Sequence, residues 1–187
     1  MRRERTLIFV KPDGVKRGLV GEVVRRFEQA GLKLISMKML WPGRELLDRH
    51  YPNDRNFLTT IGGKTKDAFA TYGLDVKRET GTDDSLEIGR QVRGWLIDDV
   101  SSGPVVAFVL EGAHAVSTVR KLVGDTLPYR AAPGTIRGDF SIDSPTVASL
   151  EKRPVRNLIH ASGSVEDADA EISLWFKESE LFDYERV

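Results

Sequence analysis

The chain has no cysteine among its 187 residues, which removes several classes of function at once. Without thiols there is no disulfide framework, no cysteine nucleophile and no metal site built from thiolates. Long apolar runs are also missing, and none approaches the roughly 20 residues that a membrane-spanning helix needs. The opening residues, Met-Arg-Arg-Glu-Arg, lack the apolar core of a signal peptide. We therefore expect a cytoplasmic protein with no membrane partner.

Neither sign of charge dominates. Lys and Arg together number 28, as do Asp and Glu, so the formal net charge is +0 at pH 7. The chain thus lacks the global basic field that drives non-specific binding to nucleic acid, and we expect no nucleic-acid partner. A site for an anion must be local. With 40% hydrophobic and 30% charged residues, the composition is typical of a globular protein, and the length suits a single domain over residues 1–187.

Hydrophobic periodicity predicts an alternation of strands and helices. The predicted strands are 5–11, 32–40, 105–110 and 155–160, and the main predicted helices are 20–30, 44–51, 86–100, 113–123 and 165–176. Their order is that of the ferredoxin-like βαββαβ fold, which is one antiparallel sheet with helices on one face. We therefore expect an α/β protein of the α+β type, with extra helices and an inserted segment.

Two segments lack sustained periodicity. Residues 52–84 hold four glycines and only a possible short helix at 64–72, so we expect an insertion at about 52–99. Residues 125–154 read as a long loop with a possible short helix at 146–152, and we expect a lengthened loop at about 141–154. Long loops inside compact domains tend to be functional or disordered.

His160 is the first candidate for chemistry. It ends a short apolar run and is followed by Ser162, Ser164 and a predicted helix that contains Glu171. An imidazole beside hydroxyls and a carboxylate can serve as a nucleophile or a base. A lone histidine in this setting is more often structural or simply solvated, so its neighbourhood alone does not decide between the two interpretations.

Three cations strengthen the chemical interpretation. Lys11 ends the first strand, Arg120 lies near the end of a helix, and Arg137 lies in a loop shaped by glycine and proline. Arginine binds phosphate oxygens bidentately and lysine adds a point charge, although a lysine at a strand end can also simply snorkel to solvent. The Gly-x-x-x-x-Gly-Lys-Ser/Thr loop and the protein-kinase signature are both absent. These features favour phosphoryl transfer through a phosphohistidine.

Four blocks of sequence carry a family resemblance. They are Arg-Thr-Leu-Ile-Phe-Val-Lys-Pro-Asp-Gly-Val-Lys-Arg-Gly-Leu-Val-Gly-Glu (5–22), Gly-Pro-Val-Val-Ala-Phe-Val-Leu-Glu-Gly (103–112), Ala-Pro-Gly-Thr-Ile-Arg-Gly-Asp-Phe (132–140) and Asn-Leu-Ile-His-Ala-Ser (157–162). In this order they resemble the nucleoside diphosphate kinase family. The resemblance covers roughly residues 4–51 and 100–176.

The resemblance implies a ping-pong phosphotransferase. His160 would attack the γ-phosphate of a nucleoside triphosphate through Nδ1 and pass the group to a nucleoside diphosphate. Glu171 would hold the other ring nitrogen, and Ser162 would bridge to Glu171. The implied nucleotide contacts are Lys11 and Asn157 at phosphate and sugar, Tyr51 at phosphate or histidine, Arg120 with Thr126 at the diphosphate, and Arg137 as a second arginine.

The family also implies a cofactor and an assembly. Mg²⁺ would be carried by the nucleotide phosphates, with few or no direct protein ligands. The chain would form a homo-oligomer, either a hexamer or a tetramer. Replacing Arg137 is expected to slow turnover and to leave the fold intact.

Three positions depart from the family pattern. The aromatic residue that usually faces the base has no clear counterpart here. Counting back from residue 103 gives Val92 or Arg93 with Leu96 as its apolar partner, and Phe57 and Trp95 are rivals. Gly163 replaces an acidic residue after Ser162, which would remove a favourable helix-dipole contact of about 0.3–1 kcal/mol. Leu127 replaces an asparagine beside Thr126.

An alternative function is a non-catalytic ferredoxin-like module that senses nucleotides or binds RNA. A binder would not need His160, Glu171 and Ser162 together. An RNA-binding sheet would need exposed aromatic residues on its central strands, whereas Phe9 and Phe108 fall in runs that look buried.

Overall fold

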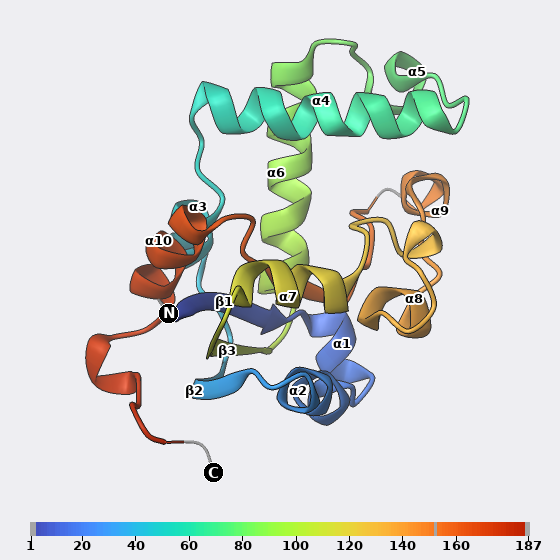
Figure 1. Cartoon of the computed structure of the whole chain (residues 1–187). Coiled ribbons are helices and arrows are strands. Elements are labelled where there is room, and N and C mark those ends of the chain that lie inside the picture. The colour runs from blue at the N-terminus through green and yellow to red at the C-terminus, as the bar shows by residue number, and fades with distance from the viewer. Residues whose placement is uncertain (1–2, 152, 186–187) are drawn as a thin grey trace.

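The computed structural model describes residues 3–151 and 153–185 and is built on a four-stranded antiparallel sheet (Figure 1). Its strand order is β2-β3-β1-β4, with β1 at Glu4–Val10, β2 at Lys33–Leu40, β3 at Val105–Gly112 and β4 at Ile159–Ala161. This order and pairing are ferredoxin-like, so the expected fold class is confirmed.

The two central strands are buried on both faces. Leu7 and Phe9 of β1 face one core cluster, while Ile8 and Val10 face the other. Successive side chains of a strand point to opposite faces, so burial of both faces requires a continuous apolar run rather than an alternating one. The same reason explains the uninterrupted run at 105–110 in β3, which is also fully buried.

Helices cover both faces of the sheet. The ferredoxin-like pair, α2 (Val20–Gln29) and α7 (Ala115–Val123), packs on the face of Ile8 and Val10. The extra helices α3 (Arg44–His50), α6 (Ser85–Ser101) and α10 (Val165–Trp175) pack on the face of Leu7 and Phe9. The expected arrangement, with helices on one face of the sheet, therefore holds for the ferredoxin-like pair but not for the extra helices. Within the described ranges, every helix is too short or too polar to span a membrane.

The segment expected to be irregular is mostly helical, and that prediction is wrong. Helix α4 runs over Arg55–Thr71 and α5 over Val76–Thr80. The carboxylate of Asp54 begins α4 by accepting a 2.9 Å hydrogen bond from the backbone N–H of Phe57. The glycines at 62 and 63 lie inside this helix, although in the sequence they indicate a turn or a helix break.

Other boundaries also differ from the prediction. The residues that follow the predicted strand at 5–11 form the short helix α1 (Pro12–Lys16), whose first residue is a proline. The loop at 125–154 contains η1 (Pro128–Arg130), α8 (Ile136–Phe140) and α9 (Pro145–Leu150), while η2 (Glu178–Glu180) follows α10. Lys152, the end of the helix predicted at 146–152, lies outside the described residues. The fourth strand has only three residues rather than the six predicted at 155–160.

Helices α4 and α6 cross at close range, which explains two of the glycines (Figure 1). A Cβ atom on Gly62 would lie 1.8 Å from the carbonyl oxygen of Ser85, and one on Gly89 would lie 2.0 Å from that of Leu58. Both contacts are with rigid backbone, so a side chain at either position would push the helices apart. Gly62 and Gly89 therefore serve packing rather than turns.

This crossing gives a first testable prediction. Gly89→Ala is expected to lower the free energy of unfolding by about 1–3 kcal/mol or more, because the new methyl group overlaps the α4 backbone. The control is Gly94→Ala on the same helix, where a Cβ meets nothing within 4 Å. It is expected to stabilise the protein by about 0.5–1 kcal/mol, because alanine favours a helix over glycine. Urea denaturation measures both, and equal effects would contradict the close crossing.

Candidate active site

His160 lies on β4 between two other rings. It pairs in register with Phe9 of β1, and the two rings stack with centroids 4.6 Å apart and planes 15° apart. The ring of His50 meets it edge-on, with centroids also 4.6 Å apart. Only 19% of the His160 side chain is exposed. These contacts fix the plane of the imidazole.

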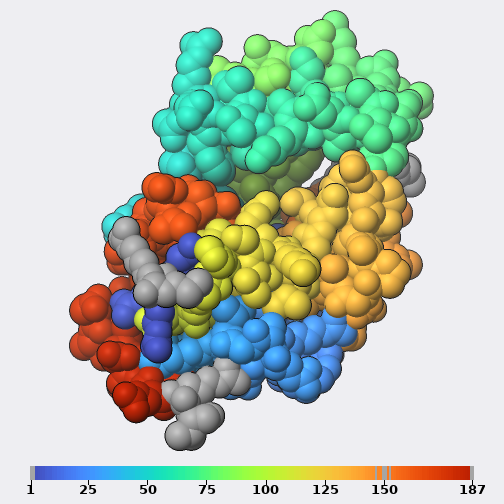
Figure 2. Space-filling model, in the orientation of Figure 1, coloured from blue at the N-terminus to red at the C-terminus, as the bar shows by residue number. Residues whose placement is uncertain are grey.

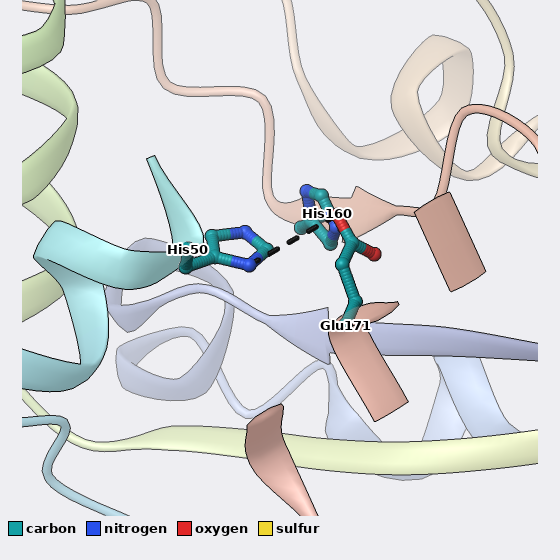
Figure 3. A group of neighbouring side chains, drawn as sticks. All are labelled: His50, His160 and Glu171. Atoms are coloured by element: carbon teal, nitrogen blue, oxygen red, sulfur yellow. Dashed lines mark hydrogen bonds and ion pairs between the residues drawn. The ribbon is translucent and has the colours of Figure 1, made fainter. Parts of the chain in front are cut away.

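Glu171 and Ser162 form a hydrogen-bonded chain with His160, and Figure 3 shows the Glu171 carboxylate beside the His160 ring. Oε2 of Glu171 lies 3.0 Å from Nε2 of His160, and the Ser162 hydroxyl donates to the same oxygen at 2.6 Å. Oγ of Ser162 also accepts from the backbone N–H of Leu7 at 3.2 Å, which ties the chain to β1. The structure therefore brings together the three residues predicted to be catalytic.

The carboxylate determines which nitrogen of His160 carries the proton. Burial acts to raise the pKa of Glu171, but the charge and hydrogen bond of His160, together with His50 and Ser162, outweigh it and lower that pKa. An ionised Glu171 can only accept, so Nε2 must donate. The lone pair is then on Nδ1, which has no hydrogen-bond partner among the described residues. The ring is arranged as a nucleophile at Nδ1.

His50 completes this cluster and was missed in the sequence as a site residue. Its Nδ1 accepts a 3.2 Å hydrogen bond from the indole N–H of Trp175 and lies 3.9 Å from Glu171 Oε1. Burial lowers the pKa of His50 to about 3, with the charge of His160 acting in the same direction, so this ring is neutral at pH 7. The sequence feature that could have identified His50 is its spacing. It follows Leu47 by three residues, and Leu47 is buried on the inward side of α3.

A cavity of about 210 Å³ opens beside His160. Most of the predicted nucleotide-binding residues line it, while Glu171, Ser162 and Val92 are not in its lining. The lining residues are Lys11, Tyr51, Leu96, Arg120, Val123, Gly124, Thr126, Arg137, Asn157, Ile159, His160 and Ala161. Three of them are cations and none is a carboxylate, so the cavity suits a polyanion.

Arg137 is both a wall of the cavity and a structural clamp. Its guanidinium donates to four backbone carbonyls, those of Gly124, Asp125, Asn157 and Ile159, at 2.7–3.2 Å. Burial lowers its pKa to about 10, and the nearby Arg120 acts in the same direction. The group still carries its charge at pH 7. Because it joins the 124–126 loop to the 157–159 segment, its loss affects the fold as well as the cavity.

Arg120 and Lys11 present their charges differently. Arg120 is exposed at the C-terminal end of α7 and has no side-chain partner in the ranges 3–151 and 153–185, so it is free to bind a ligand. Lys11 is only 4% exposed, and its Nζ lies 3.9 Å from Oδ2 of Asp99. Burial lowers the pKa of Lys11, and Asp99 opposes this shift. The cavity therefore combines an exposed cation with a buried one.

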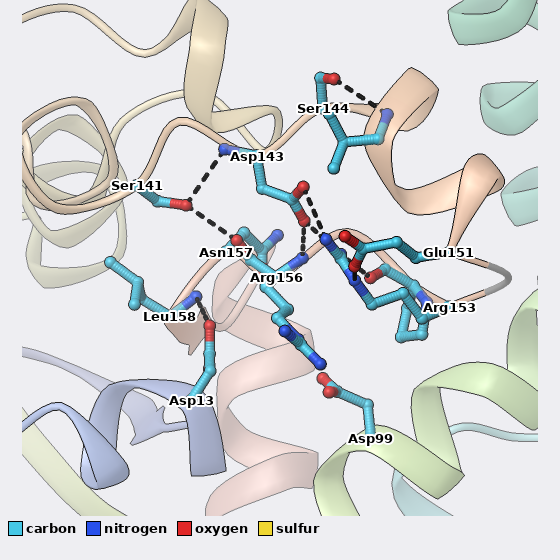
Figure 4. Close-up of polar contacts among 12 residues, drawn as sticks. Asp13, Asp99, Ser141, Asp143, Ser144, Glu151, Arg153, Arg156, Asn157 and Leu158 are labelled. Carbon is cyan, nitrogen blue, oxygen red and sulfur yellow. Dashed lines mark hydrogen bonds and ion pairs between the residues drawn. The ribbon is translucent and has the colours of Figure 1, made fainter.

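The segment before His160 is held in an uncommon conformation. Leu158 has a φ of 69°, in the left-handed region that a branched side chain rarely adopts. Its N–H donates to Oδ2 of Asp13 at 3.2 Å and its carbonyl accepts from the N–H of Lys11 at 2.8 Å (Figure 4). Asn157 donates through Nδ2 to the carbonyl of Thr126, while its buried Oδ1 has no partner among the described residues. Asn157 thus retains a free acceptor beside the cavity.

Glycine at position 163, one of the three departures from the family pattern, lies just before helix α10. Position 163 no longer supplies an acidic group, but Ser164 caps α10 by accepting from the N–H of Asp167 at 3.0 Å, and Glu166 and Asp167 lie in the first turn. The dipole of α10 is therefore complemented without an acid at 163.

At the base end, Leu96 lines the cavity and Val92 does not. The rival Arg93 donates to Asp48 and to the carbonyl of Tyr51, and Phe57 packs against the core, so neither is free to meet a base. Figure 2 shows the surface hollowed between α4 and α7, with α6 behind the hollow. Leu96 therefore brings α6 into the wall of the cavity.

An RNA-binding sheet face is not available. Phe9 and Phe108 are both 0% exposed because helices cover the two faces. Stacking of bases needs exposed rings on the sheet, so this geometry does not favour the alternative function.

Comparison with known proteins agrees with the geometry. The family model described as "Nucleoside diphosphate kinase" matches residues 4–59 and 88–181. A nucleoside diphosphate kinase of Pyrobaculum aerophilum is 48% identical over 96% of this chain and 98% of its own length, and one of Archaeoglobus fulgidus is 42% identical over 98% and 93%.

Solved structures show the same relationship. The crystal structure of an NDP kinase from Pyrobaculum aerophilum matches with a TM-score of 0.93 and 47% identity, covering 97% of this chain and all of that one. A transition-state mimic of the Borrelia burgdorferi enzyme with bound vanadate and ADP matches with a TM-score of 0.78 and 38% identity, over 98% and 93% of the two chains. With the fold, the site and these relatives in agreement, the chain belongs to the nucleoside diphosphate kinase family.

Proposed function

We propose that this protein transfers the γ-phosphate of a nucleoside triphosphate to a nucleoside diphosphate through a phosphohistidine at His160. The observation that carries the proposal is the unpartnered Nδ1 of His160, whose Nε2 is held by Glu171 at 3.0 Å beside a cavity with three cations. The Borrelia burgdorferi relative, which has vanadate and ADP bound, supports the same chemistry.

In the first half-reaction, Nδ1 attacks the γ-phosphorus. The Nδ1–P bond forms while the bond from the γ-phosphorus to the bridging oxygen breaks, and the nucleoside diphosphate leaves with that bonding pair. His160 gains positive charge in this step, and the ionised Glu171 stabilises it through Nε2. Ser162 keeps the carboxylate in place by its 2.6 Å hydrogen bond.

Positive groups stabilise the charge on the transferring phosphoryl group. The side chains of Lys11, Arg120 and Arg137 all line the cavity and can meet the phosphate oxygens there. Burial raises the pKa of Tyr51 above its usual value, with Asp99 and Glu171 acting in the same direction, so its phenol stays protonated. It can therefore donate a hydrogen bond to a phosphate oxygen or to the histidine.

The diphosphate and sugar have their own contacts. We assign Arg120 and Thr126 to the diphosphate, because both line the cavity and both are exposed. Asn157 Oδ1 is a buried acceptor without a partner among the described residues, and a ribose hydroxyl is a donor that would satisfy it. Leu96 offers an apolar face to the base, and because this contact carries no hydrogen bonds we expect broad base tolerance.

In the second half-reaction the product leaves and another nucleoside diphosphate enters the same cavity. Its terminal phosphate oxygen attacks the phosphorus, and the Nδ1–P bond breaks to restore the histidine. One site thus serves both nucleotides in turn, which is the basis of ping-pong kinetics.

Mg²⁺ fits this site as part of the nucleotide rather than of the protein. Magnesium prefers oxygen ligands, chiefly carboxylates and phosphates, and the cavity lining holds no carboxylate. The residues of the cavity would hold the Mg–nucleotide complex through its phosphates. When bound, the ion neutralises charge on the β- and γ-phosphate oxygens.

We also propose one domain over residues 1–187, with an insertion at about 52–99 and a longer loop at about 141–154. The interruption of the family match between 59 and 88 supports an insertion within the first of these ranges. The far end of that range supplies Ile97 to the core, so this end is integral to the fold.

A homo-oligomer, either a hexamer or a tetramer, is a further part of the proposal. Strand β2 is an edge strand, and the neighbouring Met37, Met39 and Trp41 are 52%, 61% and 67% exposed. An edge strand with exposed large apolar side chains favours association with another chain. Light scattering is expected to give a mass several times 20.9 kDa, and Met37→Asp with Met39→Asp is expected to lower it. A wild-type mass of 20.9 kDa would contradict the assembly.

The proposed function has a direct test. Incubation with γ-labelled ATP and Mg²⁺ should give a labelled protein whose label is lost in acid and kept in base, as expected of a phosphohistidine. Adding an unlabelled nucleoside diphosphate should then move the label to the corresponding triphosphate. A wild-type protein that takes no label, or that cannot pass it on, would overturn the proposal.

A further inference from the structure

Lys11 is a buried cation with one close carboxylate. Its side chain is 5% exposed, and Nζ forms an ion pair with Oδ2 of Asp99 at 3.9 Å. Two other charged groups face it, Asp13 from α1 and Arg137 from α8. A buried ammonium is costly unless an anion compensates it, and Asp99 is the nearest such anion among the described residues.

The carboxylate of Asp99 has no structural task of its own. Its side chain is 13% exposed, and Oδ2 is buried with no hydrogen-bond partner in the described part of the chain. It lies in the last turn of α6, far from the N-terminus that an acid would cap. The guanidinium of Arg156 points toward the carboxylate of Asp99 (Figure 4). This carboxylate caps no helix, and its buried Oδ2 accepts no hydrogen bond from the described residues. Its remaining interactions are therefore electrostatic.

The ion pair lies in the wall between two cavities. Lys11 lines the nucleotide cavity, whereas Asp99 lines a second cavity of about 780 Å³ together with Arg156. Asp99 is not among the residues of the nucleotide cavity, so it acts on a bound nucleotide through residues that line it, of which Lys11 is its ion-pair partner. Its neighbour Asp98 is different, because that side chain is 70% exposed and pairs at 3.7 Å with an equally exposed Arg44.

From this geometry we infer that Asp99 is a positioning residue, which keeps the Lys11 ammonium charged and directed toward the nucleotide phosphates. The inference rests on the proposed function, because Lys11 matters only if phosphate is the substrate. The direction of the effect follows from charge. Burial lowers the pKa of Lys11, Arg137 adds to this, and Asp99 and Asp13 raise it. Removing the Asp99 charge lets the ammonium lose its proton at a lower pH.

The test is the pH profile of kcat/KM in Asp99→Asn. Its alkaline limb is expected to move to lower pH by about one unit or more, the scale of a close charge pair in a buried site. Activity at pH 9 relative to pH 7 should then fall by about tenfold compared with the wild type. Asp98→Asn is the matched control and should leave the limb in place, while Asp99→Glu should restore it at least in part.

Tyr51 must be separated from Lys11, because its phenol also faces Asp99. In a Tyr51→Phe background, Asp99→Asn should still move the limb by the same amount. A limb that no longer moves there, or that does not move in Asp99→Asn itself, would overturn the inference. Thermal unfolding at pH 7 checks that the variant is folded, and Asp99→Ala, which removes the same charge, gives the comparison if the amide variant is not. A wild type without phosphotransfer would refute the proposed function instead, so the two failures are distinguishable.

Discussion

Replacing His160 by alanine is expected to abolish phosphotransfer. Turnover should fall by about 10⁴-fold or more, which is the scale on which enzymes lose activity when their nucleophile is removed. No other ring nitrogen can substitute. His50 is buried with Nδ1 already accepting from Trp175, and His114 lies at the start of α7, 72% exposed.

The measurement is labelling with γ-labelled ATP alongside steady-state turnover. His160→Ala should take no acid-labile label, whereas the control His114→Ala should take as much as the wild type. The fold should persist, because the side chain is partly exposed and the Phe9 and Trp175 rings keep their stacking at 4.8 Å. Label that persists in His160→Ala would place the phosphoryl group elsewhere and remove the nucleophile from this mechanism.

The second large effect is expected at Arg137, where stability and activity should fall together. Alanine removes the guanidinium donor of four backbone carbonyls, of which that of Asn157 keeps the 2.8 Å hydrogen bond it accepts from the N–H of Ile159. We expect a loss of about 3–5 kcal/mol in the free energy of unfolding, the range seen when one partner of a buried charged contact is removed. The structure thus replaces the sequence-based expectation that the fold would stay intact.

Two measurements separate the roles of Arg137. Urea denaturation gives the loss of stability, and turnover measured well below the unfolding midpoint gives the loss of phosphate binding. Arg137→Lys should retain the charge but not the four-way hydrogen bonding, so it should recover turnover more fully than stability. Arg130→Ala removes an exposed arginine whose contact with Asp125 is 3.7 Å, and it should change neither. An Arg137→Ala protein as stable as the wild type would show that the clamp contributes little.

The sequence alone determined the central sheet and the helices of simple pattern. The apolar run at 105–110 could only be a strand buried on both faces, and β3 includes all of it. The prediction of a helix at 20–30 agrees with α2 at Val20–Gln29 because its apolar spacing is regular. Phosphate chemistry was also predictable, because Lys11, Arg137 and His160 lie in three of the four blocks whose order resembles one family.

Helix α4 was not predictable, because a glycine pair inside a helix looks like a break until the crossing with α6 is known. The fourth strand was predicted too long for a related reason. Val155, Leu158 and Ile159 give 155–160 the apolar content of a strand, but Leu158 adopts a φ of 69° and its N–H donates to the side chain of Asp13. Local pattern fails where a distant segment sets the backbone.

The site shows the same division. Sequence identified His160, Glu171, Ser162 and the cations, since each lies in or next to a recognisable block. It did not reveal His50 or Asp99, which reach the site from α3 and α6 across 110 and 88 residues of chain from His160 and Lys11. Their contributions are electrostatic and depend on distance and burial. The sequence therefore determined which chemical groups are present, and only the tertiary structure decided which of them lie close enough to set one another's charge.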